Sequence, residues 1–324
     1  MATDTNRLVG AVDVGGTKVA IGLVDLDGRV QYQKSIPTNL LTTPAMAVDA
    51  IAASLAECVA ATNAGLMGIG IGCTGPVDPI LGVVGKVALL PGWEGCALVK
   101  GLASRFNVSV AMENDADAAA MAEATWGSGR GVDRFLYITL STGIGTGFVI
   151  DGKLYRGVDG SHPEMGHHGI DPTGPACYCG ARGCWESLAS GSAIQAWFGE
   201  NEPSQKRSTP LGAKQIFDLY RQGDALAARA VERLSTYVGI GLANLTTILV
   251  PGTIALGGGL LQSSDVFLSS AIDVFRSRCL EVPAHKTIVR PAMLRNDVGL
   301  LGAAAVWMQR PPEVSLDLGQ EVGQ

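Results

Sequence analysis

The sequence contains little positive charge, and that charge is scattered. No run of lysine and arginine exceeds two residues, and the formal net charge is −6. Proteins that bind nucleic acids or anionic lipids usually carry a clustered basic surface. We therefore expect neither a nucleic-acid partner nor a membrane partner.

The sequence also lacks the features of a secreted or membrane-spanning chain. Its first residues, MATDTNRL, have no basic segment followed by an apolar stretch, which predicts a cytoplasmic protein. The uncharged stretch 238–261 is long enough to cross a bilayer, but Pro251 and Gly252 interrupt it. We interpret it as a buried helix to about Ile248, a turn, and a buried strand that ends at Gly257.

The Walker loop and the dinucleotide-binding fingerprint are both absent, although the chain has 43 glycines. Instead, an apolar run from residue 9 breaks at Gly15 and Gly16 and then resumes as a second apolar run. A bare glycine turn lets backbone N–H groups approach an anion such as phosphate. Asp13 could hold Mg²⁺ through water, and Thr17 and Lys18 would add side-chain donors. Taken alone, the turn is equally consistent with an ordinary hairpin.

This opening pattern recurs about 127 residues later, in FLYITLSTGIGTGFVIDGKLYRG at 135–157. The second glycine turn includes Thr142, Gly143 and Gly145. At 324 residues the chain exceeds the length at which one hydrophobic core stops growing, about 250 to 300 residues. We therefore predict two related domains that present two glycine turns to one cleft.

Two aspartates, Asp115 and Asp117, follow a predicted strand in the stretch VSVAMENDADAAAMAEATWG. Asp115 comes after Asn114 at the junction of this strand with a helix, where its carboxylate can project into the cleft. Phosphoryl transfer needs a carboxylate that accepts the proton of the attacking hydroxyl, and Asp115 is our candidate. The alternative is that Asp115 caps the helix, a role that Asp117 fits as well.

Three of the seven cysteines fall within eight positions and follow a histidine. His167, Cys177, Cys179 and Cys184 have the spacing H-x9-C-x-C-x4-C. One imidazole and three thiolates form a closed tetrahedral set for Zn²⁺, which predicts a structural metal. The remaining cysteines are interpreted as small buried hydrophobes: Cys58, Cys73, Cys96 and Cys279.

Two glutamates flank this loop. Glu164 and Glu186 would suit hydrogen bonds to sugar hydroxyls, although a solvated surface role remains the alternative. The other histidines, His162, His168 and His285, are interpreted as surface residues or as supports behind the site.

These motifs together resemble the ROK family of sugar kinases and sugar-responsive repressors, within the actin/hexokinase/Hsp70 superfamily. The resemblance covers residues 8 to 308 and rests on DVGGTK, GCTGPVD, GWEG, ENDADAAA, STGIGTGFV, EMGH, CYCGARGCWE and ALGGG. It implies an α/β fold with two actin-like (ribonuclease H-like) ATPase domains around a central cleft, with a structural zinc loop. We expect a smaller domain at 1–117, a larger one at 118–298 with the zinc loop at 162–186, a helix at about 299–310 that packs back on the smaller domain, and a mobile tail at 311–324.

The resemblance further implies a homodimer that transfers a phosphoryl group from ATP, with Mg²⁺, to the 6-hydroxyl of a hexose. Asp115 is then the base, and the residues at the sugar are Gly75, Asn114, Asp115, Glu164, His167 and Glu186. The nucleotide and its metal would be held by Asp13, Gly15, Gly16, Thr17, Lys18, Thr142, Gly143, Gly145, Gly257 and Gly258. Zn²⁺ would be bound by His167, Cys177, Cys179 and Cys184.

Departures from the family pattern leave the sugar open. Family glucokinases usually carry an asparagine in the segment where this chain has Val87, Ala88 and Leu89. An apolar wall there could receive the methyl of an N-acetyl group. Glucose is therefore the first candidate acceptor and N-acetylmannosamine or N-acetylglucosamine the second, while polyphosphate remains open as a donor.

Two other classes of protein fit less well. A family repressor would need a helix-turn-helix domain before the first strand, which begins by residue 8. An actin-like or chaperone ATPase would leave the Cys/His loop and its flanking glutamates without a role.

Overall fold

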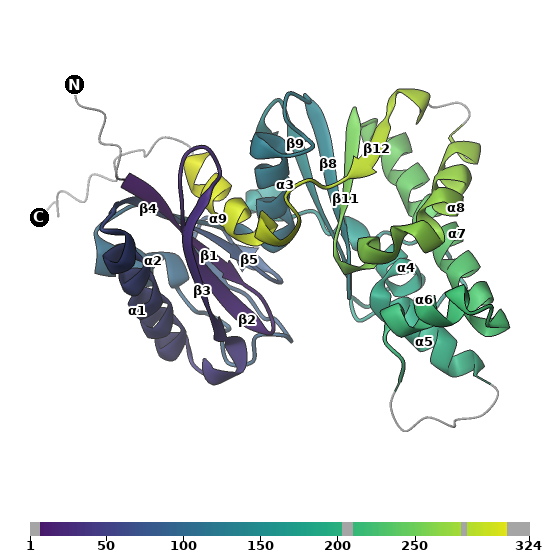
Figure 1. Cartoon of the computed structure of the whole chain (residues 1–324), viewed down its shortest axis with the longest axis horizontal. Coiled ribbons are helices and arrows are strands. Elements are labelled where there is room, and N and C mark those ends of the chain that lie inside the picture. Colours follow the sequence, from purple (N-terminus) through teal and green to yellow (C-terminus); the bar gives the residue numbers. More distant parts are fainter. Residues whose placement is uncertain (1–6, 203–209, 280–283, 310–324) are drawn as a thin grey trace, which may run out of the picture.

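The computed structural model describes residues 7–202, 210–279 and 284–309, arranged in two lobes (Figure 1). The first lobe is built on a five-stranded sheet with the order β3-β2-β1-β4-β7. Strands β1 (Arg7–Val14), β2 (Lys18–Val24) and β3 (Val30–Pro37) form an antiparallel meander, and β4 (Gly65–Cys73) and β7 (Val110–Asn114) extend it in parallel.

The second lobe repeats this topology in a sheet with the order β10-β9-β8-β11-β12. Its strands are β8 (Arg134–Leu140), β9 (Ile144–Ile150), β10 (Lys153–Leu154), β11 (Thr253–Gly257) and β12 (Ile288–Pro291). Each lobe thus has its glycine turn between the first two strands of the same fold, so the predicted internal repeat is confirmed. A small hairpin of β5 (Val77–Asp78) and β6 (Val83–Val84) extends from the first lobe.

Helices α1 (Pro44–Thr62) and α2 (Leu98–Phe106) cover the first sheet. The side chain of Thr43 caps the start of α1 by accepting from the backbone N–H of Met46, and proline occupies the first position of the helix. By length and composition, α1 is the one helix of the described chain that could cross a membrane. Its buried face, which includes Ile51 and Leu55, packs into the core of the first lobe.

The helices of the second lobe are α4 (Trp185–Ala189), α5 (Gly191–Asn201), α6 (Ala213–Arg221), α7 (Ala225–Leu249) and α8 (Ser264–Ser277). Ser190 separates α4 from α5, and its side chain caps α5. Helix α7 and strand β11 confirm that Pro251 and Gly252 divide the uncharged stretch into a helix and a strand. Cys58, Cys73, Cys96 and Cys279 are buried, as predicted.

Two helices lie between the lobes, namely α3 (Asp115–Trp126) and α9 (Val298–Met308) (Figure 1). A Cβ on Gly302 would lie 2.7 Å from the backbone of Ala118, so glycine allows the two helices to pack closely. Helix α9 also packs on the first sheet, where Leu300 and Leu301 share a core with Val9. The boundary predicted at residue 117 falls in the first turn of α3, and the tail at 311–324 lies outside the described residues.

The remaining helical segments are single 3₁₀ turns: η1 (Thr38–Leu40), η2 (Val158–Gly160), η3 (Met165–His167), η4 (Gly259–Ser263), η5 (Ala284–Lys286) and η6 (Arg295–Asp297). Of these, η3 carries His167 and η4 follows Gly258, two of the predicted site residues.

Candidate active site

The first glycine turn is a closed loop at the end of β1. The N–H of Gly15 donates to the carbonyl of Lys18 at 3.0 Å, and the hydroxyl of Thr38 donates to the carbonyl of Gly15 at 2.7 Å. A Cβ on Gly16 would lie 2.9 Å from the Cβ of Leu89. The turn therefore has a fixed shape and leaves no room for a side chain at Gly16.

Asp13 stands just before this turn. Burial, and after it the negative charge of Asp115, raise the pKa of its carboxyl to about 6 against the opposing positive charge of Lys18. Asp13 and Asp115 come from opposite ends of the first 115 residues, yet their charges act on each other. The structure thus brings these two predicted site residues together.

The junction between β7 and α3 holds Asp115 in place. The side chain of Asn114 caps α3, since its Oδ1 accepts from the backbone N–H of Ala116 at 2.8 Å and of Asp117 at 3.4 Å. Its amide also donates to the carbonyl of Gly75 at 3.2 Å. The capping role considered for Asp115 and Asp117 therefore belongs to Asn114.

The Asp115 carboxyl has the properties expected of a base. Burial raises its pKa, whereas hydrogen bonds from the Ala116 N–H and the Thr74 hydroxyl lower it, as does the charge of His162. The net effect is a pKa above the ordinary value for aspartate. A carboxylate whose pKa is raised toward the working pH accepts a proton more readily.

The second glycine turn joins β8 to β9 and contacts Glu186. The N–H of Ile144 donates to Oε2 of Glu186 at 2.8 Å, and a Cβ on Gly143 would lie 2.4 Å from the same oxygen. Gly145 lies within β9 rather than in the turn, and a Cβ there would lie 2.9 Å from that of Ala116. Gly145 is therefore a packing position against α3.

The Cys/His cluster is assembled as the spacing predicts. One nitrogen of His167 and the sulfurs of Cys177, Cys179 and Cys184 lie within 4.8 Å of one another. Nδ1 of His167 is 3.4 Å from the sulfur of Cys177, and the sulfurs of Cys179 and Cys184 are 3.6 Å apart. This donor set fits a tetrahedral Zn²⁺ site.

The second ring nitrogen of His167 faces away from the cluster. Nε2 lies 3.0 Å from the hydroxyl of Tyr178 and 4.0 Å from Oε1 of Glu186. One imidazole can thus bind a metal through Nδ1 and orient a ligand through Nε2. The position of Tyr178 was not anticipated, because nothing in the sequence distinguishes it from any exposed loop residue.

The loop from 155 to 164 contributes one side chain, His162, to a pair with Asp117 of α3 that was not predicted from the sequence. Nδ1 of His162 lies 2.7 Å from Oδ2 of Asp117, so of the two roles predicted for His162, the support behind the site fits and the surface residue does not. Nearby, Arg156 forms an ion pair with Glu113 at the end of β7. Glu164 itself is exposed and directly precedes η3, and its charge acts on Asp115.

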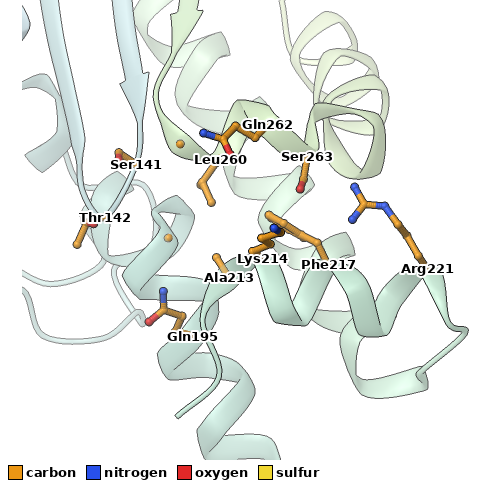
Figure 2. Close-up of a pocket in the computed structure, with 12 residues that line it drawn as sticks. Ser141, Thr142, Gln195, Ala213, Lys214, Phe217, Arg221, Leu260, Gln262 and Ser263 are labelled. Carbon is orange, nitrogen blue, oxygen red and sulfur yellow. The ribbon is translucent and has the colours of Figure 1, made fainter. Parts of the chain in front are cut away.

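A cavity of about 410 Å³ lies beside the second glycine turn in the second lobe (Figure 2). Ser141 and Thr142 line one side of it, and Lys214 and Phe217 on α6 line another. Gly258, with a φ of +91°, precedes the residues of η4 at its edge. The complete lining is Ser141, Thr142, Gly191, Gln195, Ala213, Lys214, Phe217, Arg221, Gly259, Leu260, Gln262 and Ser263. The residues of α5 and α6 in this set carry no sequence motif.

Residues 9–310 match the ROK family. This chain belongs to that family. It is 32% identical to the glucokinase of Halalkalibacterium halodurans over 98% of this chain and 99% of the relative. The crystal structure of a ROK hexokinase from Thermus thermophilus covers 93% of this chain and 98% of its own, with 34% identity and a TM-score of 0.84. A ROK glucokinase from Streptomyces griseus, in complex with glucose and AMPPNP, matches with a TM-score of 0.74 and 32% identity over 92% and 98% of the two chains. The predicted actin-like α/β fold is confirmed.

The family also contains proteins of other specificity and class. An N-acetylmannosamine kinase of Escherichia fergusonii is 33% identical over 91% of this chain and 96% of its own. A xylose repressor of Bacillus subtilis is 30% identical over 91% of this chain and 75% of its own. The protein is therefore similar to sugar kinases over nearly their whole length, and the particular sugar is a separate question.

Proposed function

We propose that this protein is an ATP-dependent hexose kinase that transfers the γ-phosphoryl group to the 6-hydroxyl of glucose. The observation that carries the proposal is the placement of Asp115, a buried carboxylate with a raised pKa whose charge acts on Asp13 beside the first glycine turn. A base on one side and a phosphate-binding turn on the other are the two elements that phosphoryl transfer requires. The similarity to glucokinases over the full length of both chains supports the same reaction.

In this reaction Asp115 accepts the proton of the 6-hydroxyl while that oxygen attacks the γ-phosphorus and the bond to the bridging oxygen of ADP breaks. The sugar is oriented by Gly75, Asn114, Glu164, His167 and Glu186. The N–H of Ile144 fixes Glu186, and the Cys/His cluster fixes His167.

The nucleotide would lie along the second lobe. The two glycine turns supply donors to the phosphates from Gly16, Thr17, Thr142 and Gly143. Gly15 gives the first turn its shape, because its N–H already donates to the carbonyl of Lys18. Lys18 adds a positive charge, and the cavity beside Thr142 receives the adenosine near Gly257 and Gly258. Gly145 packs against α3, so we assign it to the support of the second turn and not to a phosphate contact.

Two metals fit the residues present. The Asp13 carboxylate suits the water shell of Mg²⁺, which neutralises charge on the transferring phosphates. The cluster of His167 with the three cysteines suits Zn²⁺, which would hold the loop rigid and would take no part in the reaction.

A second acceptor class is favoured by one feature of the first lobe. Leu89 is 61% exposed beside Gly16. Val87 lies close to Gly75, since a Cβ on Gly75 would be 2.6 Å from a methyl group of Val87. This apolar wall suits the methyl of an N-acetyl group, so N-acetylmannosamine and N-acetylglucosamine are the alternative acceptors.

A coupled ADP-release assay tests the proposal. The purified protein is incubated with ATP and Mg²⁺ and with glucose, mannose, N-acetylglucosamine, N-acetylmannosamine, allose or fructose. In a parallel series polyphosphate replaces ATP, and the sugar phosphate formed is measured directly. We expect glucose to give the highest kcat/KM and ADP release to require sugar. ADP release without sugar, or salt-dependent binding to duplex DNA without turnover, would refute the kinase assignment. We also expect the protein to be a homodimer in the cytoplasm. Light scattering after gel filtration would measure the mass of the dimer.

A further inference from the structure

His162 and Asp117 form a buried pair that the proposed reaction does not yet use. The side chain of Asp117 is 1% exposed and that of His162 is 11% exposed. Nδ1 of His162 is 2.7 Å from Oδ2 of Asp117, while Oδ1 of Asp117 is buried with no hydrogen-bond partner among the described residues. Burying a carboxylate with one oxygen unsatisfied destabilises the fold, so stability alone does not explain the pair.

A role in helix capping does not explain it either. The N-terminus of α3 is already capped by Asn114, which accepts from the N–H of Asp117 itself. An apolar side chain at position 117 would avoid the unsatisfied oxygen. The pair therefore calls for a role in the site.

The location of the pair suggests that role. Asp117 follows Asp115 by two residues, and His162 precedes Glu164 by two residues. The imidazole contacts the carboxylate of Asp117, and the charges of Asp115 and Glu164 also act on it. Beyond them, Asp115 and Lys18 both act on the carboxyl of Asp13 beside the first glycine turn.

The electrostatics of the imidazole are consistent with this placement. Burial lowers the pKa of His162, but the hydrogen bond with Asp117 and the charges of all three carboxylates raise it, and the net direction is upward. In return, the positive charge of His162 lowers the pKa of Asp115 against the effects of burial and Glu164.

We propose that His162, held by Asp117, is a positioning residue whose positive charge keeps the Asp115 carboxylate ionised and ready to accept the proton of the sugar hydroxyl. The proton passes to Asp115 and not to the pair, since His162 already carries its proton. This inference rests on the proposed kinase function, in which Asp115 is the base. Asp117 serves to hold the imidazole and to favour its charged form.

The first test is the pH profile of kcat/KM for His162→Gln, which keeps a hydrogen-bonding group without a charge. The matched control is His285→Gln, since His285 is exposed on η5 and lies outside the site. We expect the acid limb of His162→Gln to move to higher pH by about one pH unit, a loss of about tenfold on that limb, with the KM for sugar unchanged at alkaline pH. The control should superimpose on the wild type. An equal fractional loss at every pH would assign His162 to packing and overturn the proposal.

A second test does not depend on turnover. The carboxyl of Asp115 and the ring of His162 are titrated by ¹³C and ¹⁵N NMR in the wild type, in His162→Gln and in Asp117→Asn. We expect the pKa of Asp115 to rise in His162→Gln, and that of His162 to fall in Asp117→Asn. An unchanged Asp115 titration overturns the inference even if the enzyme is active. If the wild type phosphorylates no sugar, the kinase proposal fails, and the NMR titrations still decide whether the pair controls Asp115.

Discussion

The amide of Asn114 donates to the carbonyl of Gly75 at 3.2 Å and so joins the start of α3 to the loop after β4. Because its Oδ1 caps α3, the side chain is fixed at both ends. Asn114 therefore sets the position of Asp115 relative to the loop after β4, with at most one remaining N–H for a ligand.

Asn114→Ala should weaken both the fold and the reaction. Loss of an N-cap typically destabilises a protein by about 1 kcal/mol, which urea unfolding would measure. We expect kcat to fall more than the KM for ATP rises, because the base is displaced while the nucleotide turns are unaffected. Thr43→Ala removes the cap of α1 by the same chemistry and should lower stability without lowering kcat. Equal effects of the two variants on kcat would contradict the role of Asn114.

Asp115→Asn should abolish turnover and leave sugar binding largely intact. Asparagine has nearly the same shape but cannot accept the proton, and a general base typically contributes about 10² to 10⁴ in rate. Calorimetry should give a sugar Kd close to that of the wild type. Loss of binding together with rate would instead assign Asp115 a structural role.

The sequence predicts those parts of the fold whose signals are local. The division of 238–261 into a helix and a strand follows from Pro251 and Gly252. The Cys/His spacing predicts a cluster because its ligands lie on one loop, and the structure brings those atoms together.

Features that depend on distant pairings could not be predicted. His162 and Asp117 are 45 residues apart, and only the packing of their loop against α3 makes them partners. The choice of Asn114 over Asp115 as the cap depends on backbone geometry that both residue types can satisfy. Lys214 and Phe217 line the cavity because α6 lies across it from the second glycine turn.

Asp13→Asn should stabilise the protein at neutral pH in the absence of ATP and Mg²⁺. Burial raises the pKa of Asp13 in the folded state to about 6, above the 3.8 of an exposed aspartate, so folding favours the protonated carboxyl. The ionised form therefore destabilises the fold increasingly as the pH rises from about 4 to 6 and fully above that range, by about 3 kcal/mol. Asparagine carries no charge, so the gain should be present at about pH 8 and absent at about pH 4.

Urea unfolding at the two pH values measures this difference, and activity should fall because Mg²⁺ loses its carboxylate. The control is Asp27→Asn, since that exposed side chain lies at the tip of the β2–β3 hairpin. A stability change of equal size at both pH values would contradict the burial of an ionised Asp13.

Removal of the metal should loosen the sugar site. Glu164 precedes His167 by three residues and Glu186 follows Cys184 by two, so both carboxylates depend on the order of the loop. We expect one Zn²⁺ per chain by elemental analysis. Chelation or Cys179→Ser should lower the Tm and weaken sugar binding, because a structural Zn²⁺ can contribute about 10 kcal/mol to folding. Re-addition of Zn²⁺ should restore the chelated wild type but not the variant. A purified protein without zinc would refute the assignment.

The choice of sugar should depend on Leu89, which is 61% exposed beside the first glycine turn. Leu89→Asn replaces an apolar surface with an amide that can bond a sugar hydroxyl. We expect kcat/KM for glucose to rise relative to that for N-acetylmannosamine by about tenfold, the ratio that corresponds to one hydrogen bond of about 1.4 kcal/mol. Leu26→Asn is the matched control, because Leu26 is similarly exposed but lies at the opposite end of β2. If both variants leave the ratio unchanged, the wall formed by Leu89 does not select the acceptor, and the preference must be set by the residues around Glu186.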